Sequence, residues 1–250
     1  MIRRVALAVL AGMGAGAVLV GCGDEGGVRR GIEYHDGLEL DLYVPDESGT
    51  RPAVVLVHGG GFVAGDREQL VPYAEALAGL GYVVAAIDYR LSDGSWFPTD
   101  RLDDPGLRQA AARAREDATA AVTWLRAAAD RYEVDRGRIA VLGYSAGGIT
   151  AVEVASHGAP VQAGVAIAGA GIELDALKAG DGPLLLFHGD ADVVVPVDLA
   201  DDTCDAAGAG GVACRVRRFP GEGHGIAGSQ LATIVAETDA YLRGLPAVSG

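Results

Sequence analysis

One serine in this 250-residue chain stands in a setting suited to covalent chemistry, the pentapeptide Gly143-Tyr144-Ser145-Ala146-Gly147. An apolar run, 139–142, precedes it and a small-residue segment, 146–151, follows, which predicts a sharp turn from a strand into a helix. On such a turn the serine backbone is strained and its hydroxyl is exposed. A Cβ at either flanking glycine would clash with the neighbouring strand or helix. Ser145 is therefore a candidate nucleophile.

A second group of residues has the composition of an anion-binding loop. His58-Gly59-Gly60-Gly61-Phe62 follows a continuous apolar run at 53–57. Glycines let backbone N–H groups approach a ligand closely and reach positive φ at little cost. We expect the N–H groups of Gly60 and Gly61 to stabilise an oxyanion, together with that of Ala146 at the positive end of a helix.

Acyl transfer by serine also needs a base and a group that orients it. The apolar run 184–187 leads into an acidic loop, where Asp190 and Asp192 are both candidates for the orienting acid and either could instead hold a turn. Of the five histidines, His224 alone lies between a final strand pattern and a final helix pattern. That loop would lie at the carboxyl edge of a parallel sheet, where open α/β folds bind ligands.

Strand and helix patterns alternate along the chain, which predicts an α/β fold with a mainly parallel sheet and helices on both faces. An Asp66 and Gln69 capping box should open the first helix. We expect no internal repeat and no second domain. The expected strands are 38–44, 53–57, 82–87, 139–142, 161–167, 183–187 and 214–219, and the expected helices are 67–79, 107–131, 145–157 and 229–243.

Residues 38–243 resemble an α/β-hydrolase of the carboxylesterase type, similar to bacterial hormone-sensitive-lipase-like and feruloyl or acetyl-xylan esterase-like proteins. The glycine run resembles the HGGG loop of lipases and esterases, and Ser145, Asp192 and His224 follow the nucleophile, acid, histidine order of this fold. The hydrolase pattern H-G-x-x-D-x-x-V-P implies Asp192 rather than Asp190. Asp88-Tyr89-Arg90-Leu91, Phe97-Pro98, Asp117 and 121–125 also fit the family, and an Arg90–Asp117 ion pair is expected as structural support.

The resemblance breaks off where family members carry a cap or a lid. About fifteen residues separate Cys22 from the first expected strand, and 168–182 is too short for a lid domain. We therefore expect an open, shallow site without a cap or lid. Trp96 and Phe97 could line its mouth or belong to the core.

The composition limits the partners of the chain. With 34 acidic and 20 basic residues the net charge is −14, which disfavours binding to nucleic acid or electrostatic attraction to anionic lipid. The spacing of Cys and His suggests no metal site, and the expected chemistry needs no cofactor.

The first 22 residues have the features of an export signal. Arg3-Arg4 precede a short apolar, glycine-containing run, 5–20, which is too short for a typical membrane span. The run ends in Leu19-Val20-Gly21-Cys22, which resembles a bacterial lipobox and implies lipidation of Cys22, an anchor in the membrane and a location outside the cytoplasm. An ordinary signal peptide and an uncleaved anchor are the alternatives. Residues 23–37 should be a flexible tether and lead-in, and 38–245 the hydrolase domain.

The two remaining cysteines, Cys204 and Cys214, would then lie in an oxidising compartment, either bridged or as buried thiols. The predicted function is hydrolysis of a small-molecule ester through a Ser-His-Asp triad and an acyl-enzyme. A peptidase or an acyltransferase with the same triad, or a non-catalytic ligand-binding envelope lipoprotein, are the alternatives.

Overall fold

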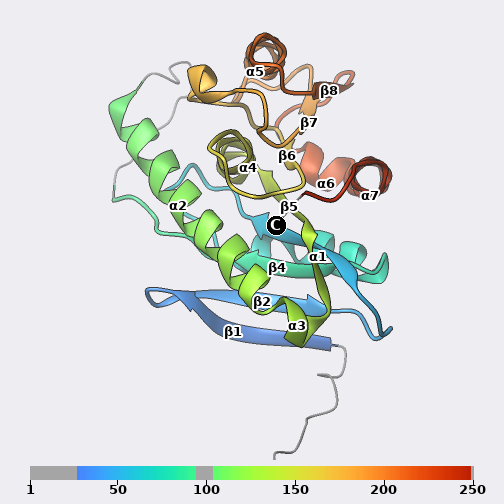
Figure 1. The fold of residues 1–250 in the computed structure, drawn as a ribbon. Coiled ribbons are helices and arrows are strands. Elements are labelled where there is room, and N and C mark those ends of the chain that lie inside the picture. The colour runs from blue at the N-terminus through green and yellow to red at the C-terminus, as the bar shows by residue number, and fades with distance from the viewer. Residues whose placement is uncertain (1–26, 94–103, 249–250) are drawn as a thin grey trace, which may run out of the picture.

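The computed structural model describes residues 27–93 and 104–248 and is built around one eight-stranded sheet (Figure 1). The strands are ordered β1-β2-β4-β3-β5-β6-β7-β8. Strand β2 pairs antiparallel with both β1 and β4, and every later pairing, from β4 through β8, is parallel. The strands are β1 (Gly27–His35), β2 (Leu38–Val44), β3 (Arg51–Val57), β4 (Val83–Ile87), β5 (Val134–Tyr144), β6 (Gly164–Ile167), β7 (Leu184–Gly189) and β8 (Cys214–Phe219). The mainly parallel sheet predicted from the sequence is confirmed.

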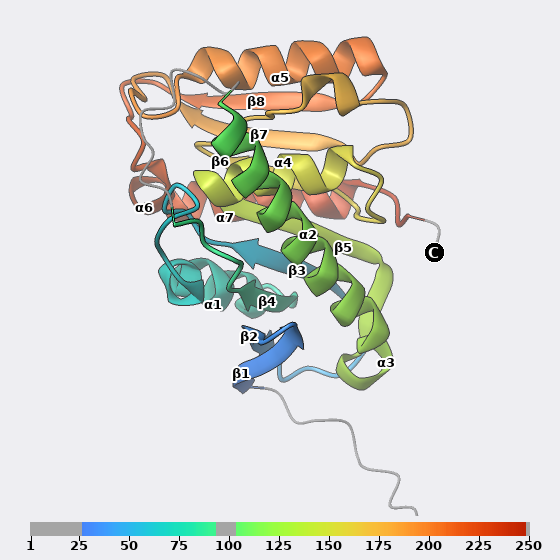
Figure 2. The same ribbon diagram turned by 90° about the vertical axis from the view of Figure 1, so that its left-hand side faces the viewer.

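Helices cover both faces of the sheet (Figure 2). Side chains of α2, α4 and α5 pack in one hydrophobic core, and those of α1, α6 and α7 pack in the other. The helices are η1 (Arg67–Leu70), α1 (Val71–Gly79), α2 (Pro105–Ala127), α3 (Ala129–Tyr132), α4 (Ala146–Ser156), η2 (Leu174–Ala176), α5 (Val197–Gly210), α6 (Ile226–Ser229) and α7 (Leu231–Gly244).

Strand β3 explains why the central strands read as unbroken apolar runs. Its residues Ala53, Val55 and Val57 face the core on the α4 side, while Val54 and Leu56 face the core on the α1 side. All five are buried. Because successive side chains of a strand point to opposite faces, a strand covered on both faces must be apolar throughout.

The expected tether over 23–37 is wrong from Gly27 onward. Residues 27–35 form β1, which pairs along the whole of β2. The turn between the two strands is Asp36-Gly37, with φ of 43° and 80°, the positive φ pair that a two-residue hairpin requires. Arg30 also forms an ion pair of 2.6 Å with Asp41 on β2. The glycines of this segment are typical of a linker, so the sequence did not predict this edge strand, which depends on pairing with β2.

The connection between β6 and β7 carries η2 and no other helix among its described residues, which agrees with the prediction that no lid is inserted there. Within the described part of the chain no helix is both long and apolar enough to span a membrane. The export signal, Cys22, Trp96 and Phe97 lie outside the described residues.

Candidate active site

Ser145 occupies a strained turn between β5 and α4. Its backbone has φ of 55° and ψ of −117°, and its N–H donates to the carbonyl of Ile167 on β6 at 2.8 Å. A Cβ on Gly143 would lie 2.1 Å from the carbonyl oxygen of Gly147, and one on Gly147 would lie 2.0 Å from that of Val57. The expected clashes at both glycines are confirmed. The turn at Ser145 is strained, and the packing of the surrounding backbone compensates for the energy of this conformation.

The structure brings the three predicted catalytic side chains together, with His224 within hydrogen-bonding distance of both Ser145 and Asp192. His224 Nε2 lies 2.9 Å from Ser145 Oγ, and His224 Nδ1 lies 2.8 Å from Asp192 Oδ2. Ser145 follows β5, Asp192 follows β7 and His224 follows β8, so each stands beyond the carboxyl end of a parallel strand. Ser145 and Asp192 are buried, whereas the His224 side chain is 19% exposed and reaches solvent.

The two candidate acids have different partners. Asp190 Oδ1 accepts a hydrogen bond of 2.6 Å from the N–H of Gly221, so it holds together the two loops that follow β7 and β8. Asp192 Oδ1 accepts hydrogen bonds from the N–H groups of Val194 and Val195, at 2.8 and 2.9 Å. These two bonds leave Oδ2 directed at His224. Of the two aspartates, Asp192 is therefore the one that contacts His224, whereas Asp190 bridges the two loops.

A second histidine, the buried His188, which is the first residue of the H-G-x-x-D-x-x-V-P pattern, also contacts Asp192. His188 Nε2 lies 2.7 Å from the carbonyl oxygen of Val195 and 3.5 Å from Asp192 Oδ2. Burial alone would raise the pKa of Asp192, but side-chain bonds from His188 and His224 outweigh it, with help from the two backbone N–H groups. The pKa of Asp192 is therefore well below its usual range, and the acid is ionised.

The glycine run adopts the positive φ angles that were expected of it. φ is 111° at Gly60, 62° at Gly61 and 64° at Phe62. The Gly60 carbonyl accepts hydrogen bonds from the N–H groups of Val63 and Ala64, both at 3.1 Å. A Cβ on Gly60 would lie 2.0 Å from the Ala64 carbonyl oxygen, so no other residue fits.

This loop packs directly on the turn that carries Ser145. A Cβ on Gly59 would lie 3.1 Å from the carbonyl oxygen of Tyr144, and one on Gly147 would lie 2.6 Å from that of His58. The His58 ring is buried and stacks on Tyr89 with 4.3 Å between ring centroids. Burial lowers the pKa of His58, so this imidazole is neutral and structural.

Gln69 is a residue of the site that sequence reasoning misassigned. In the expected capping box its side chain would have bonded back to Asp66 N–H. Instead Gln69 Oε1 accepts a 2.6 Å hydrogen bond from the N–H of Gly59, while Asp66 Oδ1 accepts from Glu68. Residues 67–70 consequently form the 3-10 helix η1, and α1 begins only at Val71. The spacing indicated a helix start correctly but could not reveal the long-range partner.

A mostly apolar pocket of about 240 Å³ lies between the η1–α1 segment and the loop that carries His224. The Tyr144 hydroxyl donates to the His224 carbonyl at 3.2 Å and the Tyr73 hydroxyl to the Ala227 carbonyl at 2.8 Å, which hold the wall of the pocket. Its lining comprises Gln69, Leu70, Pro72, Tyr73, Tyr144, Gly225, Ala227, Gly228 and Leu231. The pocket therefore lies next to the proposed site, because Tyr144 precedes Ser145, Gly225 follows His224, and Gln69 bonds to the glycine loop at Gly59.

Two structural supports expected from the sequence are present. Arg90 Nη2 lies 2.8 Å from Oδ1 of the fully buried Asp117, and the Arg90 backbone N–H donates to Oδ2 of the same carboxylate. Cys204 on α5 and Cys214 on β8 form a disulfide, with 5.1 Å between their Cα atoms. The structure thus chooses the bridge over two buried thiols.

The whole fold resembles those of solved esterases. Thermogutta terrifontis esterase 2 phosphoramylated by tabun superimposes with a TM-score of 0.72 and 24% sequence identity, covering 87% of this chain and 94% of that one. The propionate-bound form of the same esterase gives a TM-score of 0.70 and covers 90% and 97% of the two chains. This chain has the α/β-hydrolase fold.

Sequence comparison finds similarity to esterases over part of the chain. The family model described as BD-FAE matches residues 40–162. Esterase LipI of Mycobacterium tuberculosis is 36% identical over 114 residues, which are 45% of this chain and 31% of LipI. Esterase LipC of the same organism is 34% identical over 125 residues, 48% of this chain and 28% of LipC. The matches span less than half the length of these relatives.

Proposed function

We propose that this chain is a serine carboxylesterase that hydrolyses small or accessible carboxylic esters. The observation that carries the proposal is the continuous hydrogen-bonded chain from Ser145 Oγ through His224 to Asp192. The similarity to esterases LipI and LipC, and to a solved esterase, supports the same reaction class.

In this proposal His224 acts first as a base and then as an acid. Its Nδ1–H donates to Asp192, so Nε2 carries the lone pair that accepts the Ser145 proton as Oγ attacks the ester carbonyl. The ionised Asp192 stabilises the imidazolium that forms. The imidazolium then protonates the leaving alcohol, and the acyl group stays on Oγ until a water, deprotonated by Nε2, releases the acid and regenerates Ser145.

The charge on the carbonyl oxygen needs donors that are in place before the reaction. The N–H groups of Gly60, Gly61 and Ala146 fill this role in the proposal. Ala146 is the first residue of α4, so its N–H has no acceptor within the helix and adds to the positive end of the helix dipole. Each such donor contributes roughly 3 kcal/mol to transition-state stabilisation.

The architecture favours small ester groups. The β6–β7 connection carries only the short helix η2 among its described residues, and an apolar pocket of about 240 Å³ lies beside Tyr144, next to the proposed nucleophile. With a net charge of −14, the chain also disfavours polyanionic substrates.

A chain-length series of p-nitrophenyl esters tests this function, with acetylated xylan and methyl ferulate beside it. We expect kcat/KM to fall beyond short acyl groups and Ser145→Ala to abolish turnover while the circular dichroism spectrum stays unchanged. Full activity in Ser145→Ala would overturn the assignment. Transfer of the acyl group to an added alcohol, or cleavage of peptides in preference to esters, would instead identify an acyltransferase or a peptidase.

A covalent probe separates an esterase from a non-catalytic binder. Because esterase 2 of Thermogutta terrifontis is phosphorylated by paraoxon, we expect the same reagent to modify Ser145. Intact mass should increase by one diethylphosphoryl group, and peptide mapping should locate it on Ser145. The matched control is Ser156→Ala, on the same helix, which should react like the wild type.

We also propose that the protein is exported and anchored by lipid at Cys22 on the outer face of a bacterial membrane. The N-terminal pattern supports this, and the Cys204–Cys214 disulfide is consistent with an oxidising compartment. Labelled palmitate should be incorporated into the wild type, and Cys22→Ser should move the protein out of the membrane fraction. Unchanged labelling and fractionation of this variant would contradict the anchor.

A further inference from the structure

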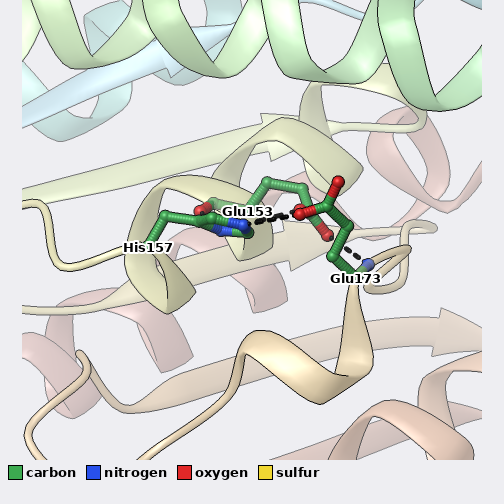
Figure 3. A group of neighbouring side chains, drawn as sticks. All are labelled: Glu153, His157 and Glu173. Carbon is green, nitrogen blue, oxygen red and sulfur yellow. Dashed lines mark hydrogen bonds and ion pairs between the residues drawn. The ribbon is translucent and has the colours of Figure 1, made fainter.

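Three side chains with metal-binding groups converge at the end of α4 that lies away from Ser145 (Figure 3). Glu153 and His157 stand one helical turn apart, and Glu173 comes from the β6–β7 connection just before η2. One ligand atom from each residue lies within 4.8 Å of the other two. None of these residues belongs to the proposed catalytic machinery.

The hydrogen bonding of His157 determines which of its nitrogens is available. Nδ1 lies 2.8 Å from the Glu153 carbonyl oxygen, which can only accept, so Nδ1 carries the hydrogen. Metal-binding histidines are commonly oriented by such a bond from the other ring nitrogen. Nε2 of a neutral ring then presents its lone pair towards Glu173.

The distance on that side is short for two groups that are both electron-rich. Glu173 Oε2 lies 2.8 Å from His157 Nε2, so a positive particle, either a proton or a metal ion, must lie between them. Two ligand atoms that each lie about 2.1 Å from one metal ion are about 3.0 Å apart at an angle of 90° and about 3.4 Å apart at the tetrahedral angle. The observed 2.8 Å is close to the first value, and it is also the length of an ordinary hydrogen bond.

The third group is a carboxylate whose two oxygens have different surroundings. The Glu153 side chain is 4% exposed, and its Oε1 accepts hydrogen bonds of 2.8 and 3.1 Å from the N–H groups of Ile172 and Glu173. Its Oε2 lies 3.7 Å from His157 Nδ1, on the side that faces the histidine. Carboxylates held in the protein interior are normally paired or bound to a cation.

The local charge is mixed. Two carboxylates and the negative end of the α4 dipole meet here, while Arg115 Nη1 lies 3.6 Å from Glu173 Oε2 and the charge of Arg108 also acts on Glu173. Glu173 lines a pocket of about 460 Å³ with Arg108 and Asp175, which gives solvent access to this end of the site. Water can therefore complete the coordination that three protein ligands leave open.

We propose that Glu153, His157 and Glu173 bind one divalent transition-metal ion of the Zn²⁺ type. One imidazole and two carboxylates suit Zn²⁺, Ni²⁺ or Co²⁺ better than Mg²⁺ or Ca²⁺, which prefer all-oxygen sites. The ion cross-links α4 to the β6–β7 connection. With 11 residues in α4 and about 1.5 Å of rise per residue, it lies about 16 Å along the helix from the turn at Ser145, so its role is structural.

Calorimetric titration of the EDTA-treated full chain with ZnCl₂ tests the site. We expect one saturable site that Ca²⁺ and Mg²⁺ do not fill, and a rise in Tm of about 5 °C when Zn²⁺ is well above its Kd. His157→Gln and Glu173→Gln should each weaken binding at least tenfold. Glu173 is half-exposed and its replacement keeps the side-chain shape, so that variant should fold even if Glu153→Gln does not.

Matched controls separate this site from other ligands. His35→Gln removes a histidine that lies 3.6 Å from Asp36 in the β1–β2 hairpin, and it should bind Zn²⁺ like the wild type. His224→Gln should keep the same stoichiometry while losing esterase activity, so failure of the metal site and failure of the proposed function are distinguishable. Absence of a 1:1 site, or unchanged binding in His157→Gln and Glu173→Gln, would overturn the proposal and leave a protonated His157 paired with Glu173.

Discussion

A histidine lies near each end of α4, His224 beside Ser145 at the N-terminal end and His157 at the C-terminal end, and the two have similar hydrogen bonds at Nδ1. At both ends Nδ1 donates a hydrogen bond to an oxygen, Asp192 Oδ2 for His224 and the Glu153 carbonyl for His157. The difference lies at Nε2. For His224 it faces the hydroxyl of Ser145, which can give up a proton, and for His157 it faces the carboxylate of Glu173, which cannot.

The helix itself adds to this difference. Its N-terminal end presents unpaired N–H groups that favour the anion formed on an ester carbonyl, and its C-terminal end presents carbonyl groups that favour a cation. We therefore propose a proton acceptor, His224, at one end and a ligand or charged partner, His157, at the other. The neighbours of each imidazole and its place relative to the helix decide which role it has.

Replacing His224 or His157 with glutamine tests this contrast, and the loss of kcat/KM in His224→Gln should exceed that of the variants that follow. His224→Gln should lower kcat/KM by about 10⁴-fold or more, because it removes the proton acceptor. His157→Gln should leave kcat/KM of p-nitrophenyl acetate within about threefold of the wild type. A folded His157→Gln protein without esterase activity would show that the two ends are not independent.

Asp192→Asn should reduce kcat by about 10³- to 10⁴-fold without changing the shape of the site. The amide can donate a hydrogen to His224 Nδ1, which favours the tautomer that lacks a lone pair on Nε2. Burst-free steady-state kinetics with p-nitrophenyl acetate measure this loss. The matched control is Asp190→Asn, whose residue bonds to Gly221 N–H and not to His224, and it should retain most of the activity.

The Asp192→Asn substitution should also change how the stability of the fold depends on pH. The folded-state pKa of Asp192 lies below its unfolded value, so its carboxylate stabilises the fold above about pH 4, and this contribution is lost as pH falls further. Urea unfolding should therefore show a stability difference between wild type and Asp192→Asn at pH 7 that shrinks at pH 3. A difference that grows on acidification would contradict the assigned direction of the shift.

Gln69→Ala should lower kcat about tenfold with KM changed less than twofold. The reason is that the glycine loop loses the hydrogen bond from Gly59 N–H to Gln69 Oε1, which holds Gly59 in place. Gln69→Glu keeps an acceptor oxygen at the same position and should recover most of the rate. Glu68→Ala is the neighbouring control, and it should behave like the wild type. Equal losses in all three variants would mean that η1, and not the Gly59 bond, supports the loop.

Breaking the disulfide has the smallest expected effect on catalysis. Cys204→Ser with Cys214→Ser opens a bridge between residues ten apart in sequence, which should cost about 2–3 kcal/mol of unfolding free energy. Thr203 on α5 accepts a hydrogen bond from Gly171 in the β6–β7 connection. A less ordered α5 should therefore disturb this connection, which contains Glu173, more than it disturbs Ser145, Asp192 and His224. Thermal unfolding should shift while kcat stays within about twofold, and a large loss of kcat would contradict this order.

The outcome for β1 and Gln69 shows where sequence reasoning stops. Residues 27–35 contain glycines and charges typical of a linker, and they become a strand only because β2 offers a complementary edge across the Asp36-Gly37 turn. Gln69 has the spacing of a capping residue, yet its amide bonds to a loop ten residues earlier. Both features depend on contacts that local spacing does not encode.

The local geometry of the proposed active site could be predicted from residue types. Glycines at 143 and 147 permit the turn at Ser145 and glycines at 59–61 permit the glycine loop, while strand patterns before Asp192 and His224 place both residues beyond strand ends. These are requirements on backbone conformation, and residue type meets them directly.

Contacts between side chains of different elements depend on how those elements pack, and local sequence patterns do not predict them. Glu173 reaches His157 from another segment, His188 contacts the acid that follows its own strand, and Cys204 lies close enough to Cys214 to form a bridge. Glu153 and His157 do have the spacing of one helical turn, but a third ligand cannot be read from that spacing. Such meetings depend on how helices and loops pack on the sheet, and packing is a property of the whole chain.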